Sequence, residues 1–576
     1  MDLKRIPEYQ LEEERILKEM NSKAYRLRHK KSGARVFLLE NDDNNKVFTI
    51  AFRTPPGDST GTPHILEHSV LCGSDKYPSK DPFVELVKGS LNTFLNAMTY
   101  PDKTMYPVAS CNDKDFQNLM SVYMDAVFHP NIYKNEKLFR QEGWHYELES
   151  EDADLIYNGV VYNEMKGAFS SPEEVMGRYN KQLLFPHTPY AFESGGDPEV
   201  IPELSYEDFL AFHKKYYHPS NSYIYLYGDM NMEEKLIWMD REYLGKYDAI
   251  EVDSAIPLEP AFDRMREDTI FYGITDSESE EEGAYLSWSK VAGSELDPKK
   301  YLAFQVLEYV LLNAPGAPVK KALLDAGIGK DIFGGYDGEL LQPTFTIAAK
   351  SAKPEQKEEF AALIQKVLRE QAENGLNKNS LLAGLNNCEF RCREADYGRF
   401  PKGLMYGLQA FESWIYDDTA PMIHLAYDET FAFLREAVNT GYFEELIRED
   451  LLSNQHGVLL TVLPKKGYLK EMEERTAKKL AEFKASLTPD QIKELVRQTK
   501  ELKEFQDTPS TEEELEAIPM LNVSDIKKEA EPIINEERNV HGTAVLFHPV
   551  LTGEIGYLEA VFRADAVEME DLPYLS

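Results

Sequence analysis

Cysteine, long apolar runs and positive charge are all scarce in this chain of 576 residues. Its cysteines, Cys72, Cys111, Cys388 and Cys392, are too few for a disulfide-built secreted scaffold. No stretch approaches 18 apolar residues without a charge, which argues against a membrane-spanning helix. Lys and Arg number 63 against 100 Asp and Glu, so the formal net charge is −37. Such a surface repels phosphate backbones, which argues against nucleic-acid binding, and it attracts basic peptides or metal ions.

The N-terminal segment offers no targeting signal. It has no apolar core of a secretory signal and is too acidic for a transit peptide. We therefore expect a reducing, cytoplasmic compartment, unless a leader has been removed. Cys388 and Cys392 are spaced i,i+4 in an expected helix, but no second Cys/His pair lies nearby to complete a metal site.

The first 250 residues mix strand and helix patterns. Strands are expected at 35–39, 47–53 and 222–227, and helices at 62–72, 82–90, 114–128, 135–148, 158–168 and 231–244. A linker rich in proline and acidic residues follows at 247–262. This order predicts one α+β domain over residues 1–250.

The next region repeats the first. Residues 305–309 align with 64–68, and at the same spacing 347–351 align with 106–110. An amphipathic helix follows each second match, at 114–128 and at 356–370, and a strand at 284–289 precedes the second copy as 48–53 precedes the first. The alternative is that the two α/β segments resemble each other by chance. Two matches in the same structural order favour a duplication, with a homologous domain at 251–466.

The last third is charged and helical before it turns to strands. Residues 467–486 and 489–505 predict a helical hairpin within 467–530, with Thr488 as the cap and Pro489 at the first helical position. The hairpin is either a solvated pair of helices or a hinge arm between larger units. Residues 556–563 read as a strand resembling 48–53, so we expect 531–576 to begin a third homologous domain of a longer protein. The expected fold class is therefore α+β, with two duplicated mixed α/β domains, a charged hairpin and the start of a third repeat.

The sharpest motif is His64-Ile65-Leu66-Glu67-His68. Residues four apart share one helical face, so both imidazoles can reach one ion, with Glu67 beside them. Composition alone predicts about 0.04 chance matches to such a pattern. The order H-x-x-E-H is typical of the inverzincin zinc peptidases. The alternative is a pair of helix histidines that face a core.

A hydrolytic zinc site takes three protein ligands, so the motif needs a third. Downstream candidates are Glu142, His145, Glu147, Glu149 and Glu164, and periodicity does not choose among them. Glu164 lies in a helical stretch, 159–167, whose apolar side can hold a carboxylate rigidly.

Four segments resemble the pitrilysin and insulin-degrading-enzyme family, and specifically its presequence-protease branch. They are TPHILEHSVLCGS (62–74), LNTFLNAMTYPD (91–102), QEGWHYEL (141–148) and GVVYNEMKG (159–167). The resemblance spans nearly the whole chain and implies one zinc ion per chain. It also implies that His64, His68 and Glu164 are the ligands and that Glu67 is the general base.

The same resemblance implies how a peptide binds. Asn96 and Ala97 would lie on an edge strand that pairs with the extended substrate, and Phe83, Val84 and Val87 would form an apolar pocket beside the scissile bond. Val84 stands where some relatives have a bulkier aromatic, which alters the expected side-chain preference. Ordinary core packing is the alternative role for these apolar residues.

The resemblance implies a zinc-dependent endopeptidase that degrades short unstructured peptides, with basic ones favoured by the charge. The second copy carries Gln305 and Tyr309 in place of the histidines, so we expect it to wall a chamber without binding metal. In the family a C-terminal half closes that chamber, so we expect this chain alone to bind zinc and to have weak or no activity. A non-catalytic scaffold or a peptide-binding subunit of the same fold is the alternative, and the intact His64, Glu67, His68 and Glu164 set favours the enzyme.

Overall fold

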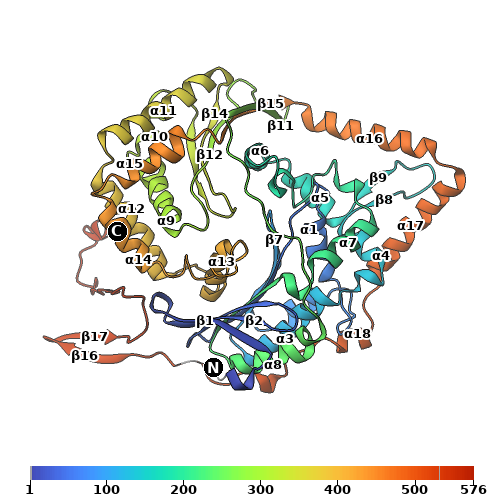
Figure 1. Ribbon diagram of the computed structural model, residues 1–576, viewed down its shortest axis with the longest axis horizontal. Helices are drawn as coiled ribbons and strands as arrows, with labels where there is room; N and C mark the ends of the chain where they lie inside the picture. The colour runs from blue at the N-terminus through green and yellow to red at the C-terminus, as the bar shows by residue number, and fades with distance from the viewer. Residues whose placement is uncertain (1–2, 531, 576) are drawn as a thin grey trace.

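The first of two large sheets has eight strands in a computed structural model that describes residues 3–530 and 532–575 (Figure 1). Its order is β1-β2-β3-β10-β4-β7-β5, and the short β6 also pairs with β7. The strands expected at 35–39, 47–53 and 222–227 are confirmed as β3, β4 and β10. The bounds are β1 Tyr9–Leu17, β2 Ser22–His29, β3 Arg35–Glu40, β4 Lys46–Arg53, β5 Asn92–Leu95, β6 Met98–Thr99, β7 Lys103–Ser110 and β10 Ser222–Gly228.

The second sheet has the order β11-β15-β12-β14-β13, which repeats β3-β10-β4-β7-β5 of the first. The strand directions match as well, because β3–β10 and β11–β15 are the parallel pairs and the remaining pairs of both series are antiparallel. The duplication predicted from the sequence is thus confirmed by topology. The bounds are β11 Arg266–Ile274, β12 Ala284–Val291, β13 Asp331–Asp337, β14 Thr344–Ala352 and β15 Gly457–Lys466.

Each sheet carries its own layer of helices. The helices of the first repeat are α1 Thr62–Val70, α2 Pro82–Gly89, α3 Asp113–Phe128, α4 Glu136–Glu142, α5 Val160–Ala168, α6 Pro172–Leu184, α7 Tyr206–Tyr216 and α8 Met232–Glu242. Those of the second repeat are α9 Pro298–Glu308, α10 Pro318–Asp325, α11 Lys357–Asn374, α12 Lys378–Glu394, α13 Lys402–Trp414, α14 Asp428–Ala437 and α15 Tyr442–Leu446. The domain boundaries set at 250, 466 and 530 stay predictions.

Strand β4 shows that the first sheet is buried on both faces. Phe48, Ile50 and Phe52 belong to the core beneath α1 and α3, whereas the alternate residues Val47 and Ala51 belong to the core shared with the second repeat. Because side chains alternate across a strand, this pattern requires a cover on each face.

The two repeats cover each other by exchanging helices. Helix α13 of the second repeat packs on β10 and β4, and helix α6 of the first lies on β11, β12 and β15. Trp414 of α13 contacts the rings of Phe37 and Tyr223. Gly403 and Gly407 permit the approach, because a Cβ on either would lie 2.1 or 2.6 Å from a tyrosine ring of β10. The repeats therefore form one packed unit.

A buried carboxylate also joins the repeats. Asp102 is 0% exposed, and its Oδ2 accepts hydrogen bonds from Tyr190 and from Tyr416 of the second repeat, both at 2.6 Å. Its Oδ1 lies 3.4 Å from the amine of Lys103, which is buried as well. A charge this deep is tolerated because it is paired and hydrogen-bonded.

A cavity of about 320 Å³ lies beside this contact, between β7 and helices α9, α12 and α13. Glu412 lines it and accepts a 2.8 Å hydrogen bond from the Tyr301 hydroxyl. The pKa of Glu412 is raised to about 8, first by burial and then by the charge of the Glu295 carboxylate, against the opposing effects of His424 and of the Tyr301 hydrogen bond. Glu412 is therefore a protonated acid in the folded protein at neutral pH.

Glu412→Gln should raise stability selectively at high pH. The folded pKa of Glu412 lies above its ordinary value of 4.5, so the folded state binds the extra proton and stability falls as pH rises from about 4.5 to about 8. Glutamine mimics the neutral acid and removes that dependence. The midpoint of thermal unfolding should therefore be higher in the variant than in wild type at pH 8.5 and nearly equal at pH 5. Gln at the exposed Glu436 is the control, and an equal gain at both pH values would contradict the assignment.

The predicted hairpin is confirmed as α16 (Tyr468–Ser486) and α17 (Pro489–Asp507). Thr488 and Gln491 form a reciprocal capping box, and Pro489 occupies the first turn. Figure 1 shows the hairpin leaving the second sheet at β15 and returning to the first repeat. There α17 packs on α4 and β8, and the Thr499 hydroxyl accepts the Leu148 N–H. The hairpin thus connects the two repeats physically.

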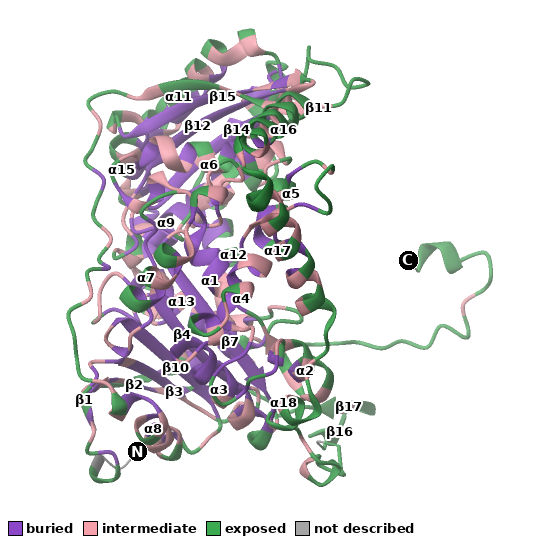
Figure 2. Cartoon of the chain, turned by 90° about the vertical axis from the view of Figure 1, so that its right-hand side faces the viewer, coloured by how far each residue is buried: buried purple, intermediate pink, exposed green. Residues whose placement is uncertain are grey.

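Two expectations on secondary structure are wrong. The helix expected at 135–148 ends at Glu142, and β8 (His145–Glu147) then pairs with β9 (Ile156–Asn158). The strand expected at 556–563 does not form, because no strand within 3–530 and 532–575 pairs with its N–H and C=O groups. The described part of 531–576 instead holds a hairpin, β16 (Glu536–Val540) and β17 (Thr543–Phe547), and an exposed tail that points away from the body (Figure 2). Residues 531 and 576 lie outside the described residues.

No helix within 3–530 and 532–575 is long and apolar enough to cross a membrane.

Candidate metal centre

Helix α1 holds both histidines of the motif on one face. It begins after Gly61, whose φ of 71° suits glycine, and Pro63 occupies its first turn. The rings of His64 and His68 lie 5.0 Å apart, centroid to centroid, at 77°. Both side chains point toward α5, which approaches from the other side of the site. The local sequence therefore places two imidazoles together, as the spacing predicted.

Helix α5 supplies the third group. The Oε2 atom of Glu164 lies 3.8 Å from Nε2 of His64 and 3.8 Å from Nε2 of His68. One ligand atom of each residue lies within 4.8 Å of the others, and among the described residues this is the group of His, Cys, Asp and Glu side chains that is close enough to hold a metal. The Glu164 side chain is 54% exposed, so the cluster opens to solvent on one side.

The other candidates for the third group lie elsewhere. Glu142 contacts His68 from behind, through Nδ1 rather than Nε2. Nδ1 of His145 is paired with the carbonyl of Arg140. Glu147 and Glu149 both pair with Lys503 of α17. The strand pair β8–β9 turns the chain so that α5, which carries Glu164, faces α1.

Each histidine is oriented through its second ring nitrogen. Nδ1 of His64 lies 3.0 Å from the carbonyl oxygen of Gly195, and Nδ1 of His68 lies 3.3 Å from Oε2 of Glu142. Both contacts leave Nε2 free to face Glu164, an arrangement common to metal-binding histidines. No local sequence pattern points to Gly195, because it lies 131 residues from His64.

His68 and Glu142 shift each other's pKa in opposite directions. Burial lowers the pKa of His68, but the hydrogen bond to Glu142 and the charges of Glu67, Glu142 and Glu164 outweigh it, so the pKa is raised. Burial raises the pKa of Glu142, and the bonds from His68 and Gln141 reverse this, so the pKa is lowered. Glu142 is therefore held as a carboxylate behind His68.

Glu67 lies beside the cluster and outside it. Its Oε2 accepts a 2.6 Å hydrogen bond from the hydroxyl of Thr99 on β6. Thr99 was missed from sequence, since threonine on a strand carries no signal of its own. The bond leaves the carboxylate anchored at one oxygen, with the other available to a molecule at the site.

The residues predicted to bind substrate lie on α2 and between β5 and β6. Val84 and Val87 on α2 are 39% and 53% exposed, and Phe83 is partly buried against the core. Asn96 and Ala97 fall between β5 and β6, not inside a strand. The break has a cause, because Pro107 on β7 has no N–H to offer opposite Asn96.

The second repeat has no such cluster among the residues described. Glu308 aligns with Glu67, but its Oε2 accepts the N–H of Tyr336 on β13 and its Oε1 accepts the side-chain amide of Asn313. Gln305 and Tyr309 stand where the histidines would be. The Glu308 carboxylate therefore holds β13, the edge strand of the second sheet, in place.

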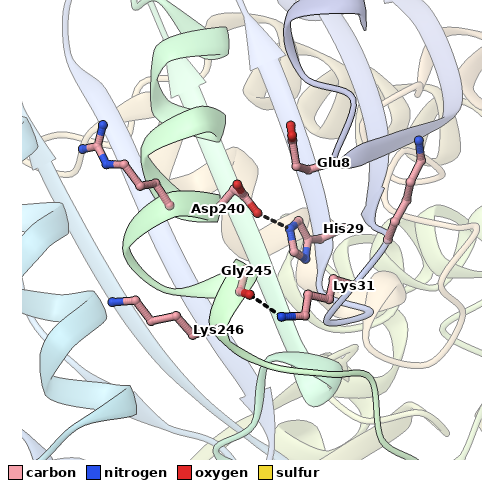
Figure 3. Close-up of a pocket in the computed structure, with 8 residues that line it drawn as sticks. Glu8, His29, Lys31, Asp240, Gly245 and Lys246 are labelled. Atoms are coloured by element: carbon pink, nitrogen blue, oxygen red, sulfur yellow. Dashed lines mark hydrogen bonds and ion pairs between the residues drawn. The ribbon is translucent and has the colours of Figure 1, made fainter.

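Another hollow, of about 310 Å³, lies between the end of β2 and α8 (Figure 3). His29 is fully buried there, with Nδ1 on the Ser32 hydroxyl and Nε2 3.0 Å from Asp240. Lys31 donates to the carbonyl of Gly245 at 2.6 Å. Since both nitrogens of His29 are engaged, these contacts tie α8 to the sheet.

Three models of related domains match the chain. Residues 53–169 match "Insulinase (Peptidase family M16)", residues 203–387 match "Peptidase M16 inactive domain", and residues 462–576 match a segment associated with the same peptidases. The first match contains the His64, His68 and Glu164 cluster.

Individual proteins agree with these matches. The chain is 47% identical over 559 residues to Protein HypA of Clostridium perfringens, covering 97% of this chain and 57% of that protein. It is 42% identical over 571 residues to Presequence protease 1, chloroplastic/mitochondrial, of Arabidopsis thaliana, covering 97% of this chain and 52% of that protein. The chain thus spans little more than half the length of these relatives.

A solved structure shows the same fold. The crystal structure of pitrilysin superposes with a TM-score of 0.56 at 17% identity, over 83% of this chain and 50% of that one. The domain matches and the relatives establish that the chain belongs to peptidase family M16, the pitrilysin and insulinase family, in its presequence-protease branch.

Proposed function

We propose that this chain carries the catalytic centre of a zinc-dependent endopeptidase that degrades short unstructured peptides. One observation carries the proposal: His64, His68 and Glu164 bring three ligand atoms within 4.8 Å of one another from two helices that are far apart in sequence. Two imidazoles and one carboxylate are the ligand set of many hydrolytic zinc sites.

The cluster fits a zinc ion in its chemistry and its spacing. Ligand atoms around tetrahedral zinc lie about 3.3 Å apart, given bonds of about 2.0–2.1 Å. The two 3.8 Å separations need only a small contraction. Both Nε2 atoms are left as acceptors because Nδ1 of each ring faces a carbonyl or carboxylate oxygen. Three ligands leave a fourth position for a small molecule.

The proposed chemistry divides between the ion and Glu67. Zinc, when bound, supplies Lewis acidity toward water and the peptide carbonyl. Glu67 takes the proton from the attacking water and delivers it to the leaving amine, as a general base and then a general acid. Thr99 holds one oxygen of that carboxylate and so fixes the direction of the other.

The proposed substrate is an extended peptide beside this centre. Asn96 and Ala97 follow β5, the edge strand of the first sheet, where an extended peptide would add as a strand. Val84 and Val87, which are exposed, and Phe83 would form the apolar pocket for its side chains. The net charge of −37 favours basic peptides through long-range attraction. Relatives named presequence proteases support this substrate class, and the sequence they have beyond this chain would complete the chamber.

Zinc content tests the proposal directly. Elemental analysis should find one zinc per wild-type chain, a large loss in Glu164→Gln and a complete loss in His64→Ala, since each removes one of three ligands. Glu149→Gln is the matched control, because Glu149 pairs with Lys503 away from the cluster. A well-folded wild-type chain without zinc after metal is supplied would overturn the metal centre and favour a scaffold of the same fold.

A further inference from the structure

We propose that Glu193 is a positioning residue for the metal ligand His64, and that it couples His64 to the docking of α6 on the second repeat. The inference rests on the proposed function, because it concerns the same metal centre. It adds a residue outside the predicted ligand set and a physical route by which the second repeat controls the first.

The route begins at the carbonyl of Gly195, 3.0 Å from Nδ1 of His64. The loop that carries it lies flush against the start of α1. A Cβ on Gly61 would lie 2.8 Å from the Gly195 oxygen and 2.7 Å from Cα of Gly196. Both Gly61 and Gly196 also have positive φ, of 71° and 100°. The carbonyl can therefore reach His64 only while this loop keeps its place.

Glu193 holds the loop in place. Its side chain is nearly buried, its Oε1 accepts the N–H of Gly195 at 3.2 Å, and its own N–H donates to the Ser59 hydroxyl at 3.1 Å. The Glu193 carboxylate thus fixes the peptide whose next carbonyl orients His64. No contact between Glu193 and the metal ligands is needed for this effect.

The other oxygen of Glu193 faces α6. Its Oε2 lies 3.3 Å from Nε of Arg178 and 3.9 Å from the amine of Lys181. The guanidinium of Arg178 also lies 4.1 Å from the centre of the Phe169 ring, at the end of α5, the helix that carries Glu164. Basic side chains of α6 therefore contact Glu193, which holds the loop beside His64, and Phe169, at the end of the helix that carries Glu164.

Helix α6 in turn is fixed by the second sheet. The amide of Asn180 donates to the Ser287 hydroxyl on β12 at 2.8 Å, and both side chains are buried. Glu173 accepts from Tyr285 at 2.9 Å and pairs with Lys350 at 2.5 Å. His456 contacts the carbonyl of Leu184 at 2.7 Å. The contacts run without interruption from β12 through α6 and Glu193 to His64.

The test measures metal binding instead of turnover. Glu193→Gln removes the charge that faces Arg178 and Lys181 and so releases the loop that orients His64 from α6. Zinc affinity should fall by about tenfold in chelator competition, a typical cost of disturbing an outer contact of a ligand. Cobalt(II) bound in place of zinc should show a shifted visible spectrum, because the ligand field at His64 changes. Asn180→Ala should shift both readouts in the same direction, and its effect should not add to that of Glu193→Gln if they share one route. The exposed Glu203→Gln, in the same segment, should match wild type.

Zinc affinity within twofold of wild type and an unchanged cobalt spectrum in a folded Glu193→Gln would overturn the inference. Additive effects of Glu193→Gln and Asn180→Ala would overturn the coupling. If Glu193→Gln fails to fold, Gly195→Ala replaces it, since its Cβ would press on Met165 and Oε1 of Glu193 without a backbone clash; unchanged zinc affinity there would count equally against the inference. A wild-type chain without metal would instead refute the proposed function, so the two failures are distinct.

Discussion

Glu67→Gln should retain zinc and lower peptide cleavage by roughly 10²- to 10⁴-fold, the range that a general acid–base residue contributes. The amide has nearly the shape of the carboxylate and can still accept the Thr99 hydroxyl bond. It cannot take a proton from water at neutral pH. Since Glu67 is outside the His64, His68 and Glu164 cluster, the ligand set is unchanged.

The measurement is cleavage of a short unstructured fluorogenic peptide with protein in excess, so that even slow single-turnover cleavage by this chain is recorded. Zinc content of the same samples is measured in parallel. Glu136→Gln is the control, because Glu136 is a surface residue paired with Arg140 on α4. A Glu67→Gln protein that cleaves within a few fold of wild type would exclude Glu67 as the base.

Asp102→Ala should destabilise the protein by about 3–5 kcal/mol, the usual cost of removing one partner of a buried ion pair. The change leaves the Lys103 amine without that carboxylate and removes the acceptor of the Tyr190 and Tyr416 hydroxyls. The lost interactions lie at the contact between the repeats. The fall in the free energy of unfolding should therefore be seen in urea unfolding followed by the fluorescence of Trp288 and Trp414 in the second repeat.

Two further variants separate charge from hydrogen bonding. Asp102→Asn keeps an acceptor for the tyrosines but not the charge, so its loss of stability should be intermediate. Asp75→Ala removes a surface carboxylate paired with Lys134 and should cost less than about 1 kcal/mol. Equal unfolding midpoints for wild type and Asp102→Ala would show that Asp102 does not join the repeats.

Local patterns predicted most of the helices and strands and the shared face of His64 and His68, whose role as metal ligands stays a prediction. His64 and His68 follow from a helical spacing, and Thr488 with Pro489 from capping preferences, because both depend on residues within one turn. The duplication could be seen because one domain's strand and helix order recurs at a fixed spacing. Glu164 was implied as the third ligand by the resemblance alone, and that role stays a prediction. Its place opposite α1 depends on the β8–β9 pair, where a longer helix was expected.

Features set by tertiary contacts could not be read from the sequence. Gly195 and Glu142 act on the histidines across 131 and 74 residues, and no local pattern marks them. The gap at Asn96 and Ala97 comes from a proline on a neighbouring strand. The stretch 556–563 has strand composition but pairs with no strand in the described part of the chain, and strand formation requires a partner strand.

The exchange of α6 and α13 has a consequence for biosynthesis. As the chain emerges from the ribosome, the first sheet can gather its own helices early, but its second face, with Phe37, Tyr223 and Tyr225, has no cover until α13 has been made. For nearly two hundred residues of synthesis that apolar face is open to water and to other chains. Folding by successive domains, the usual course for long chains, leaves an aggregation-prone intermediate here. We therefore expect nascent chains halted before residue 402 to be captured by chaperones, and those halted beyond α13 to be released.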